Sequence, residues 1–365
     1  MKKLALFVAV GLMGLSACQE NKSYTIQGTI SGANDGEYVY LETIKTNTIL
    51  FDTAIVKEGR FTFKGEPVDA LNTRYVNYTS PKVKMGAMLF LEKGNIQVHL
   101  DAKGSTISGT ESNDALAAFT KKTAEFTAEM QGLCKRCLFD TTISAEQRKV
   151  MEKQVTDLSQ AQTDYIFEQT KTNAGKLFGV YLLKKFGMDY SVEKIAPLLE
   201  QIPAEYATDA KIVKLKEHVK NTLNSAEGEK FVDFSMKTPE GTEVKLSDIV
   251  SKNKYTLVDF WASWCGPCCN EMPNVVKVYA QFKDKGLDIV GVSLDQEAEK
   301  WQKAIKDLNM TWTQLSDLKG WKNEAAKLYS VRSIPSTLLI DQQGNIVARD
   351  LRGKGLSDKL EELFK

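Results

Sequence analysis

The chain has 365 residues, with 48 Lys and Arg against 47 Asp and Glu and a formal net charge of +1. Apolar residues make up 42% and charged residues 26%, which is ordinary for folded protein and excludes a wholly disordered or collagen-like chain. The balanced charge lacks the basic excess typical of nucleic-acid binding, so no nucleic-acid partner is expected. The length allows roughly two or three domains.

The N-terminus has the layout of an export signal. Two lysines precede the apolar run LALFVAVGLMGL, and small residues follow it up to Cys18. The run is too short to span a bilayer, so it predicts a signal peptide over residues 1–17 rather than a transmembrane helix. The ending LSAC resembles the bacterial lipobox, which implies that Cys18 is lipidated and that residues 18–23 form the lipidated N-terminus and linker. The alternative is a plain signal peptide with a chance cysteine.

Three patterns follow one another along the rest of the chain. Residues 24–109 contain short runs rich in Val, Ile, Tyr, Phe and Thr, which predict an antiparallel β-sandwich-like domain. Residues 110–224 place apolar side chains three and four apart and predict a helical middle domain, with Ser144 and Gln147 as a capping box. Between residues 225 and 365 strand and helix patterns alternate, which indicates an α/β layer fold.

The segment DFWASWCGPCCNEMP, residues 259–273, carries residues suited to thiol chemistry. A helix that begins here places Cys265 at its N-terminus, where free N–H groups and the helix dipole favour a thiolate. Pro267 fits the first turn of such a helix, and Cys268, one turn further, suits a resolving thiol. Asp259 on the incoming strand is placed to accept a proton from Cys268. The pattern predicts a redox-active disulfide, Cys265–Cys268, and no other cofactor.

The remaining cysteines leave alternatives open. Cys134 and Cys137 form a second C-x-x-C pair, and in an oxidising compartment a structural disulfide between them is expected. Because Lys135 and Arg136 would lower the thiol pKa values, a second redox relay is the alternative. Cys269 is expected to be a small buried group rather than a catalytic thiol. A zinc site built from both pairs is disfavoured, because they lie far apart in the sequence, so no metal is expected.

The motifs resemble a known family. VDFWASWCGPC is similar to the thioredoxin active-site segment almost residue for residue, and WCGPCCNEMP with the lead-in FVDFSMKTPEGTEVKLSDI resembles the membrane-anchored TlpA/ResA branch. SIPSTLLID resembles the family's cis-proline loop. The resemblance covers about residues 226–365 and implies a thioredoxin fold. It also implies the following roles: Cys265 nucleophile, Cys268 resolving thiol, Asp259 proton acceptor and Pro335 cis-proline.

The same resemblance implies a substrate surface beside the cysteines. The surface consists of Trp264, Gly266, Pro267 and Ile334. A cis Ile334–Pro335 bond would expose the Ile334 backbone for strand-like pairing with a substrate. This chain departs from the branch in two ways: Asn is frequent where Asp259 stands, and the acidic residue of a later loop falls nearest Gln296, with Asp295 and Glu297 beside it.

These observations predict a thiol-disulfide oxidoreductase, anchored by lipid in the bacterial cell envelope and facing the periplasm or the outside. The runs GEYVYLE, GRFTFKG and LEKGNI resemble the N-terminal β-domain, of uncharacterised function, found on some bacterial redox lipoproteins. Thioredoxin shares the Gly-Pro dipeptide and has a potential of about −270 mV, far below the roughly −120 mV of a strong periplasmic oxidant. Reduction or isomerisation of disulfides in exported proteins is therefore expected, with a membrane electron donor. The alternatives are a disulfide-donating oxidase, a peroxidase, and a partner- or ligand-binding lipoprotein with an accessory redox domain.

Overall fold

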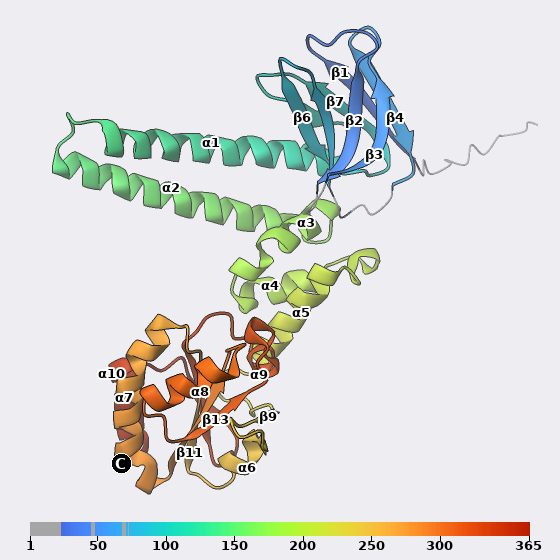
Figure 1. Cartoon of the computed structure of the whole chain (residues 1–365). Helices are drawn as coiled ribbons and strands as arrows, with labels where there is room; N and C mark the ends of the chain where they lie inside the picture. The colour runs from blue at the N-terminus through green and yellow to red at the C-terminus, as the bar shows by residue number, and fades with distance from the viewer. Residues whose placement is uncertain (1–22, 45–47, 68–70, 72) are drawn as a thin grey trace, which may run out of the picture. The chain divides into compact units, whose positions relative to one another are not determined.

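A computed structural model describes residues 23–44, 48–67, 71 and 73–365 (Figure 1). The predicted signal peptide and the lipidation site Cys18 lie outside the described residues. The chain divides into two compact units. The first comprises the residues up to Lys185 together with Gln201–Tyr206, and the second comprises Phe186–Glu200 and Ala207–Lys365. Among the described residues, no helix is both long and apolar enough to cross a membrane.

The first unit contains two four-stranded sheets, with strand orders β4-β1-β7-β8 and β3-β2-β5-β6. The strands are β1 Tyr24–Ile30, β2 Tyr38–Ile44, β3 Thr48–Ile55, β4 Arg60–Gly65, β5 Arg74–Thr79, β6 Lys84–Leu89, β7 Gly94–Leu100 and β8 Thr106–Ser108. Alternate side chains of β1, such as Tyr24 and Ile26, are buried, as a strand with one face on a core requires. Among the described strands, the expected antiparallel sandwich contains one parallel pair, β1 with β7.

A long helical hairpin continues this unit. Its helices are α1 Glu111–Phe139 and α2 Ala145–Thr172, and α3 Leu177–Phe186 follows. The predicted capping box is confirmed: the Gln147 N–H donates to Ser144 Oγ at 3.2 Å, and the Ser144 N–H donates to Gln147 Oε1 at 2.8 Å. Asn113 is fully buried near the start of α1, and its side chain bonds the backbone N–H and carbonyl of Phe90. The hairpin is thereby fixed to the β-sheets.

The second unit begins with two helices and continues into one seven-stranded sheet of order β10-β9-β13-β12-β11-β14-β15. The strands are β9 Ser235–Lys237, β10 Glu243–Lys245, β11 Tyr255–Trp261, β12 Leu287–Ser293, β13 Thr313–Ser316, β14 Ser336–Asp341 and β15 Ile346–Arg349. The helices are α4 Val192–Leu199, α5 Ala210–Leu223, α6 Leu246–Val250, α7 Gly266–Phe282, α8 Ala298–Asp307, α9 Glu324–Leu328 and α10 Gly353–Leu363. The multi-domain architecture with a C-terminal α/β thioredoxin fold is confirmed.

The centre of this sheet positions the site. β11 and β12 run parallel, and nearly every residue of both is buried, because helices cover the two faces of the sheet. α7 and α10 pack beside each other (Figure 1). β11 ends at Trp261 and α7 begins at Gly266. The short link between them therefore lies at the carboxyl edge of the parallel strands, where sheets of this kind place their sites.

Candidate active site

Cys265 occupies the N-cap of α7, as the sequence predicted. Its backbone is extended, with φ −85° and ψ 95°, and the Cys268 N–H donates to Cys265 Sγ at 3.2 Å. Pro267 lies in the first turn, where its missing N–H leaves no helical bond unmade. The sulfur of Cys265 therefore faces free N–H groups at the positive end of the helix dipole, an arrangement that stabilises a thiolate.

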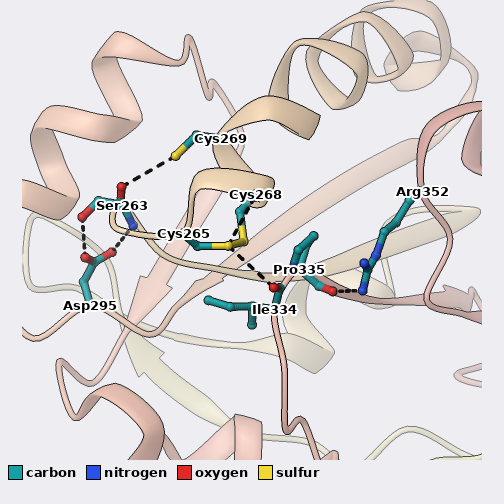
Figure 2. The surroundings of a disulfide bond; sticks show 8 residues. All are labelled: Ser263, Cys265, Cys268, Cys269, Asp295, Ile334, Pro335 and Arg352. Atoms are coloured by element: carbon teal, nitrogen blue, oxygen red, sulfur yellow. Dashed lines mark hydrogen bonds between the residues drawn. A yellow bond between two sulfur atoms is a disulfide. The ribbon is translucent and has the colours of Figure 1, made fainter. Parts of the chain in front are cut away.

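Cys265 and Cys268 are joined by a disulfide (Figure 2). Cys265 is 5% exposed and Cys268 1%, so Cys265 is the more accessible of the two residues. Cys269, half-buried, is a free thiol that donates to the Ser263 carbonyl at 3.6 Å. Burial first, and then the Asp295 charge, raises the pKa of the Cys269 thiol. Cys269 is therefore held in its neutral, poorly nucleophilic form.

The predicted cis bond between Ile334 and Pro335 is present, in the loop before β14. Ile334 O lies 3.7 Å from Cys265 Sγ, so in the dithiol form the Cys265 thiol is placed to donate to this carbonyl (Figure 2). On the other side of the loop, the Arg352 guanidinium donates to the Pro335 carbonyl. Two elements distant in sequence thus fix the loop against the cysteines.

Asp259 is buried on β11, with 3% of its surface exposed. Burial is the main cause that raises the pKa of Asp259 to about 7; the Glu271 charge raises it further and the Arg352 charge opposes this. Glu271 lies on α7 one turn beyond Cys268, so the charge that raises this pKa comes from the helix that carries the cysteine pair. A carboxyl with this pKa exchanges a proton near neutral pH, which is the requirement for a proton acceptor.

The residues expected at the substrate surface are accessible. Trp264 is 55% exposed, Gly266 and Pro267 are exposed, and Ile334 is half-buried. A Cβ added at Gly266 would meet nothing within 4 Å, so open space lies beside the disulfide. The structure therefore leaves a face on which a polypeptide could lie against the cysteines.

The sequence is similar to known protein families and to characterised relatives. Residues 228–349 match the AhpC/TSA family, and residues 24–116 match a domain of unknown function, DUF4369. The thioredoxin-like protein YneN of Bacillus subtilis is 36% identical over 130 residues, covering 35% of this chain and 72% of that protein. The thiol-disulfide oxidoreductase ResA of Oceanobacillus iheyensis is 33% identical over 138 residues, covering 37% of this chain and 69% of that protein. The chain belongs to the thioredoxin-like thiol-disulfide oxidoreductases.

Solved structures are also similar to part of this oxidoreductase. The thioredoxin domain of thiol-disulfide oxidoreductase BVU-2223 from Bacteroides vulgatus is 36% identical and covers 38% of this chain and 99% of that chain, with a TM-score of 0.36. A thiol-disulfide oxidoreductase from Bacteroides fragilis is 34% identical and covers 37% of this chain and 99% of that chain, with a TM-score of 0.35. Each covers less than half of this chain.

Sequence reasoning placed the acidic position of the later loop nearest Gln296 and did not identify Glu271, and the structure gives Asp295 and Glu271 roles in holding the oxidoreductase's site together. The buried Asp295, just after β12, accepts hydrogen bonds from the Ser263 N–H at 2.9 Å, the Ser263 hydroxyl at 2.6 Å and the Ser293 hydroxyl at 2.8 Å (Figure 2 shows the Ser263 pair). Asp295, rather than Gln296, is thus the residue of that loop that anchors the turn before the cysteines. Glu271 accepts from the Gly353 N–H at 2.7 Å. The position of Asp295 at the carboxyl end of a buried strand was the signal that could have found it.

The second disulfide expected from the sequence is not formed, because Cys134 and Cys137 are both free thiols. Both lie inside the continuous helix α1, where Cys134 is exposed and Cys137 is buried. Cys265 differs because it is an N-cap with extended backbone, which turns its sulfur toward the first helical turn. Among the described residues, no group of three or more His, Cys, Asp or Glu is arranged to hold a metal ion.

Proposed function

We propose that the oxidoreductase is a lipid-anchored reductase or isomerase of protein disulfides in the bacterial cell envelope. The observation that carries this proposal is the Cys265–Cys268 pair at the N-terminus of α7, with the Ile334 carbonyl 3.7 Å from Cys265 Sγ. That carbonyl belongs to a loop that can pair with an extended polypeptide, which favours a protein substrate over a small molecule.

Reduction begins from the dithiol form. The Cys265 thiolate attacks one sulfur of a substrate disulfide; the substrate S–S bond breaks, a mixed disulfide forms, and the released substrate sulfur takes up a proton. Cys268 then attacks Cys265 Sγ, the mixed disulfide breaks, and the Cys265–Cys268 disulfide forms as the second substrate thiol leaves. Two electrons pass from the enzyme to the substrate.

The residues around the cysteines support each half of this exchange. The Cys268 N–H and the helix dipole stabilise negative charge on Cys265, which is the attacking group in the first half. In the second half Cys268 attacks Cys265 Sγ, and the substrate sulfur is the leaving group. Asp259 accepts the Cys268 proton as Cys268 attacks, and its pKa of about 7 matches a proton transfer near neutral pH. The exposed Trp264, Gly266 and Pro267 form the surface on which the substrate rests.

The substrates are exported proteins that carry disulfides or thiols, and a membrane protein supplies electrons to Cys265 and Cys268. Lipid on Cys18 holds the enzyme at the membrane, facing the periplasm or the outside. The Gly-Pro dipeptide supports the reducing direction, because thioredoxin, with the same dipeptide, is a strong reductant at about −270 mV. Whether the enzyme reduces or oxidises its substrates in the cell depends on how fully the membrane donor keeps Cys265 and Cys268 reduced.

Acid-quenched thiol trapping of the full-length protein in its bacterium tests the direction. Free thiols are blocked at the moment of lysis, and the number of modified cysteines is read by mass. We expect Cys265 and Cys268 to be mostly reduced, since an electron donor keeps the pair in the dithiol form. A mostly oxidised pair in the wild type would indicate a disulfide-donating oxidase instead. The same measurement reports on Cys134 and Cys137, whose sulfurs we expect to remain unpaired.

A further inference from the structure

Two exposed tryptophans meet beside the disulfide. Trp264 and Trp321 are 55% and 50% exposed, and their ring centroids lie 6.1 Å apart with the ring planes at 54°. The chain has five tryptophans, and the other three are at most 5% exposed. Trp264 directly precedes Cys265, whereas Trp321 comes from the connection between β13 and α9. An exposed apolar pair adjoining a reactive centre is typical of a binding surface.

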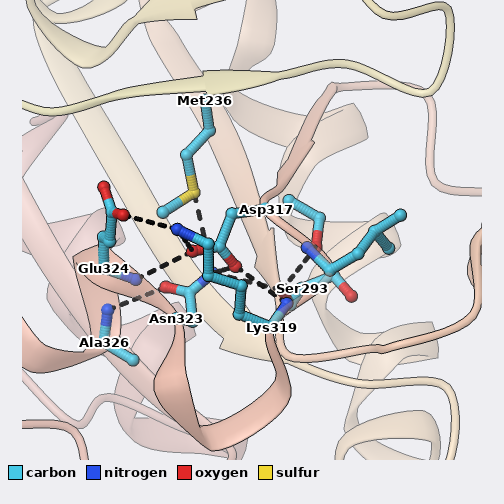
Figure 3. A network of polar contacts seen from close by, with 9 residues as sticks. Met236, Ser293, Asp317, Lys319, Asn323, Glu324 and Ala326 are labelled. Atoms are coloured by element: carbon cyan, nitrogen blue, oxygen red, sulfur yellow. Dashed lines mark hydrogen bonds and ion pairs between the residues drawn. The ribbon is translucent and has the colours of Figure 1, made fainter.

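The loop that carries Trp321 is held by hydrogen bonds of the Asp317 and Asn323 side chains (Figure 3). The Asp317 carboxylate accepts from the Lys319 N–H at 3.1 Å, the Asn323 side-chain amide at 2.9 Å and the Glu324 N–H at 3.1 Å. Asn323 is fully buried, caps α9 by accepting from the Ala326 N–H at 2.9 Å, and donates to the Ser293 carbonyl at 3.5 Å. The backbone on both sides of Trp321 is therefore fixed before any substrate binds.

The same loop presents a second apolar side chain. Leu318 is 36% exposed with a left-handed backbone, φ +54°. Gly320 also has positive φ, +58°, and a Cβ there would lie 3.1 Å from the Gln296 side chain. The loop thus adopts a conformation that only a small residue at Gly320 tolerates easily, and this conformation brings Trp321 to Trp264.

We infer that residues 317–323 form a second wall of the active site, and that Trp264 and Trp321 together bind an aromatic or large apolar side chain next to the substrate's reactive cysteine. The inference rests on the proposed function and names its substrate class: extended polypeptide segments with such a side chain near the cysteine, as incompletely folded proteins expose. Ile334 adjoins Cys265 from the loop before β14 and is available to the substrate backbone. Rigid indoles bind such a side chain at low entropic cost.

The test uses the reduced full-length protein and three disulfides. Two are cyclic peptides of identical sequence except for Phe or Ser beside one cysteine, and the third is oxidised glutathione, which is too small to need the wall. We expect the wild type to reduce the Phe peptide with a kcat/KM about fivefold above that of the Ser peptide. Trp321→Ala should abolish this preference and leave the reduction of glutathione unchanged. Trp321→Phe, which keeps a ring, should retain most of the preference.

Val213→Ala is the matched control, because Val213 is an exposed apolar residue, 39% accessible, on α5 of the same unit. It should leave all three rates and the preference as in the wild type. Equal preferences in the wild type and Trp321→Ala would overturn the inference, and so would a wild type that reduces both peptides equally well. A wild type that reduces none of the three disulfides would overturn the proposed function, and the inference with it.

Discussion

The charge of Glu271 on α7 raises the pKa of Asp259 on β11, and only burial contributes more. The Glu271 carboxylate also accepts from the Gly353 N–H at 2.7 Å, which fixes it between α7 and the start of α10. Arg352, the neighbour of Gly353, acts in the opposite direction and lowers the pKa of Asp259. The short segment after β15 therefore acts on this pKa in two ways: Gly353 fixes the Glu271 carboxylate, which raises it, and Arg352 lowers it.

Asp259→Asn should slow reduction of a protein disulfide by about a hundredfold at neutral pH, because Asn cannot accept the Cys268 proton. In the wild type, the carboxylate form needed for this transfer becomes populated as pH rises through about 7. The rate should therefore rise across that range, and Asp259→Asn should lose this rise. Stopped-flow reduction of a peptide disulfide at several pH values checks this, and an unchanged pH profile in the variant would refute the role.

The burial of the Asp259 carboxyl also makes the stability of the folded protein depend on pH. The pKa of Asp259 is about 7 in the folded protein against an ordinary value of 3.8, so between these values the unfolded chain binds fewer protons and stability falls as pH rises. Asp259→Asn should match the wild type at pH 4 and be more stable at pH 8, by up to about 4 kcal/mol. Denaturation followed by tryptophan fluorescence measures this, since all five tryptophans lie in the second unit. Equal stability at pH 8 would contradict the raised pKa.

Glu271→Gln should move the pH dependence of the reduction rate to lower pH. The amide oxygen can still accept from the Gly353 N–H, while the charge that raises the pKa of Asp259 is removed. Arg352→Gln is the matched variant of opposite sign, since Arg352 lowers that pKa, and it should move the dependence to higher pH. The reduction rates of the wild type, Glu271→Gln and Arg352→Gln are measured against pH in the same buffers. If the two variants shift the pH dependence in the same direction, this electrostatic account is excluded.

Local sequence predicted the parts of the site that short segments determine. The N-cap at Cys265 depends on its neighbours along the chain, and the resemblance of SIPSTLLID to a cis-proline loop implied the cis bond before Pro335, so both were predicted without the fold. Asp295, Arg352 and Trp321 act across elements, and their partners become known only when the strands are placed in order. The Cys134–Cys137 disulfide was inferred from the compartment, although α1 continues through both residues.

The middle of the chain shows the same limit. α3, Leu177–Phe186, lies in the region predicted to be helical but was not identified as a separate helix, because buried residues occupy most of its faces and no apolar stripe with helical period stands out. β8, Thr106–Ser108, has three residues, too few for an alternating pattern. In contrast, the Ser144–Gln147 box identified the start of α2, since a capping box is a local arrangement.

Substitution to serine should distinguish the roles of the three cysteines at the start of α7: Cys265 at the N-cap and Cys268 and Cys269 in the first turn. Cys265→Ser should abolish disulfide reduction, because the attacking sulfur is lost. Cys268→Ser should accumulate a mixed disulfide between Cys265 and the substrate, since nothing resolves it. Cys269→Ser should reduce disulfides at the wild-type rate, because the raised pKa of Cys269 keeps this thiol neutral. Mass spectrometry of quenched reactions identifies the trapped species, and a stable mixed disulfide on Cys269 would contradict the assignment.

Lipidation of Cys18 should decide whether the protein stays with membranes. A single acyl chain gives marginal binding and two or more give firm anchoring, so a diacylated Cys18 needs no further membrane contact. The full-length protein should enter the detergent phase in Triton X-114 partition, and Cys18→Ala should remain in the aqueous phase. Cys134→Ala is the matched control, because Cys134 is an exposed thiol whose removal leaves the N-terminus intact, and it should partition like the wild type. Detergent-phase recovery of Cys18→Ala would show that something other than this lipid holds the protein at the membrane.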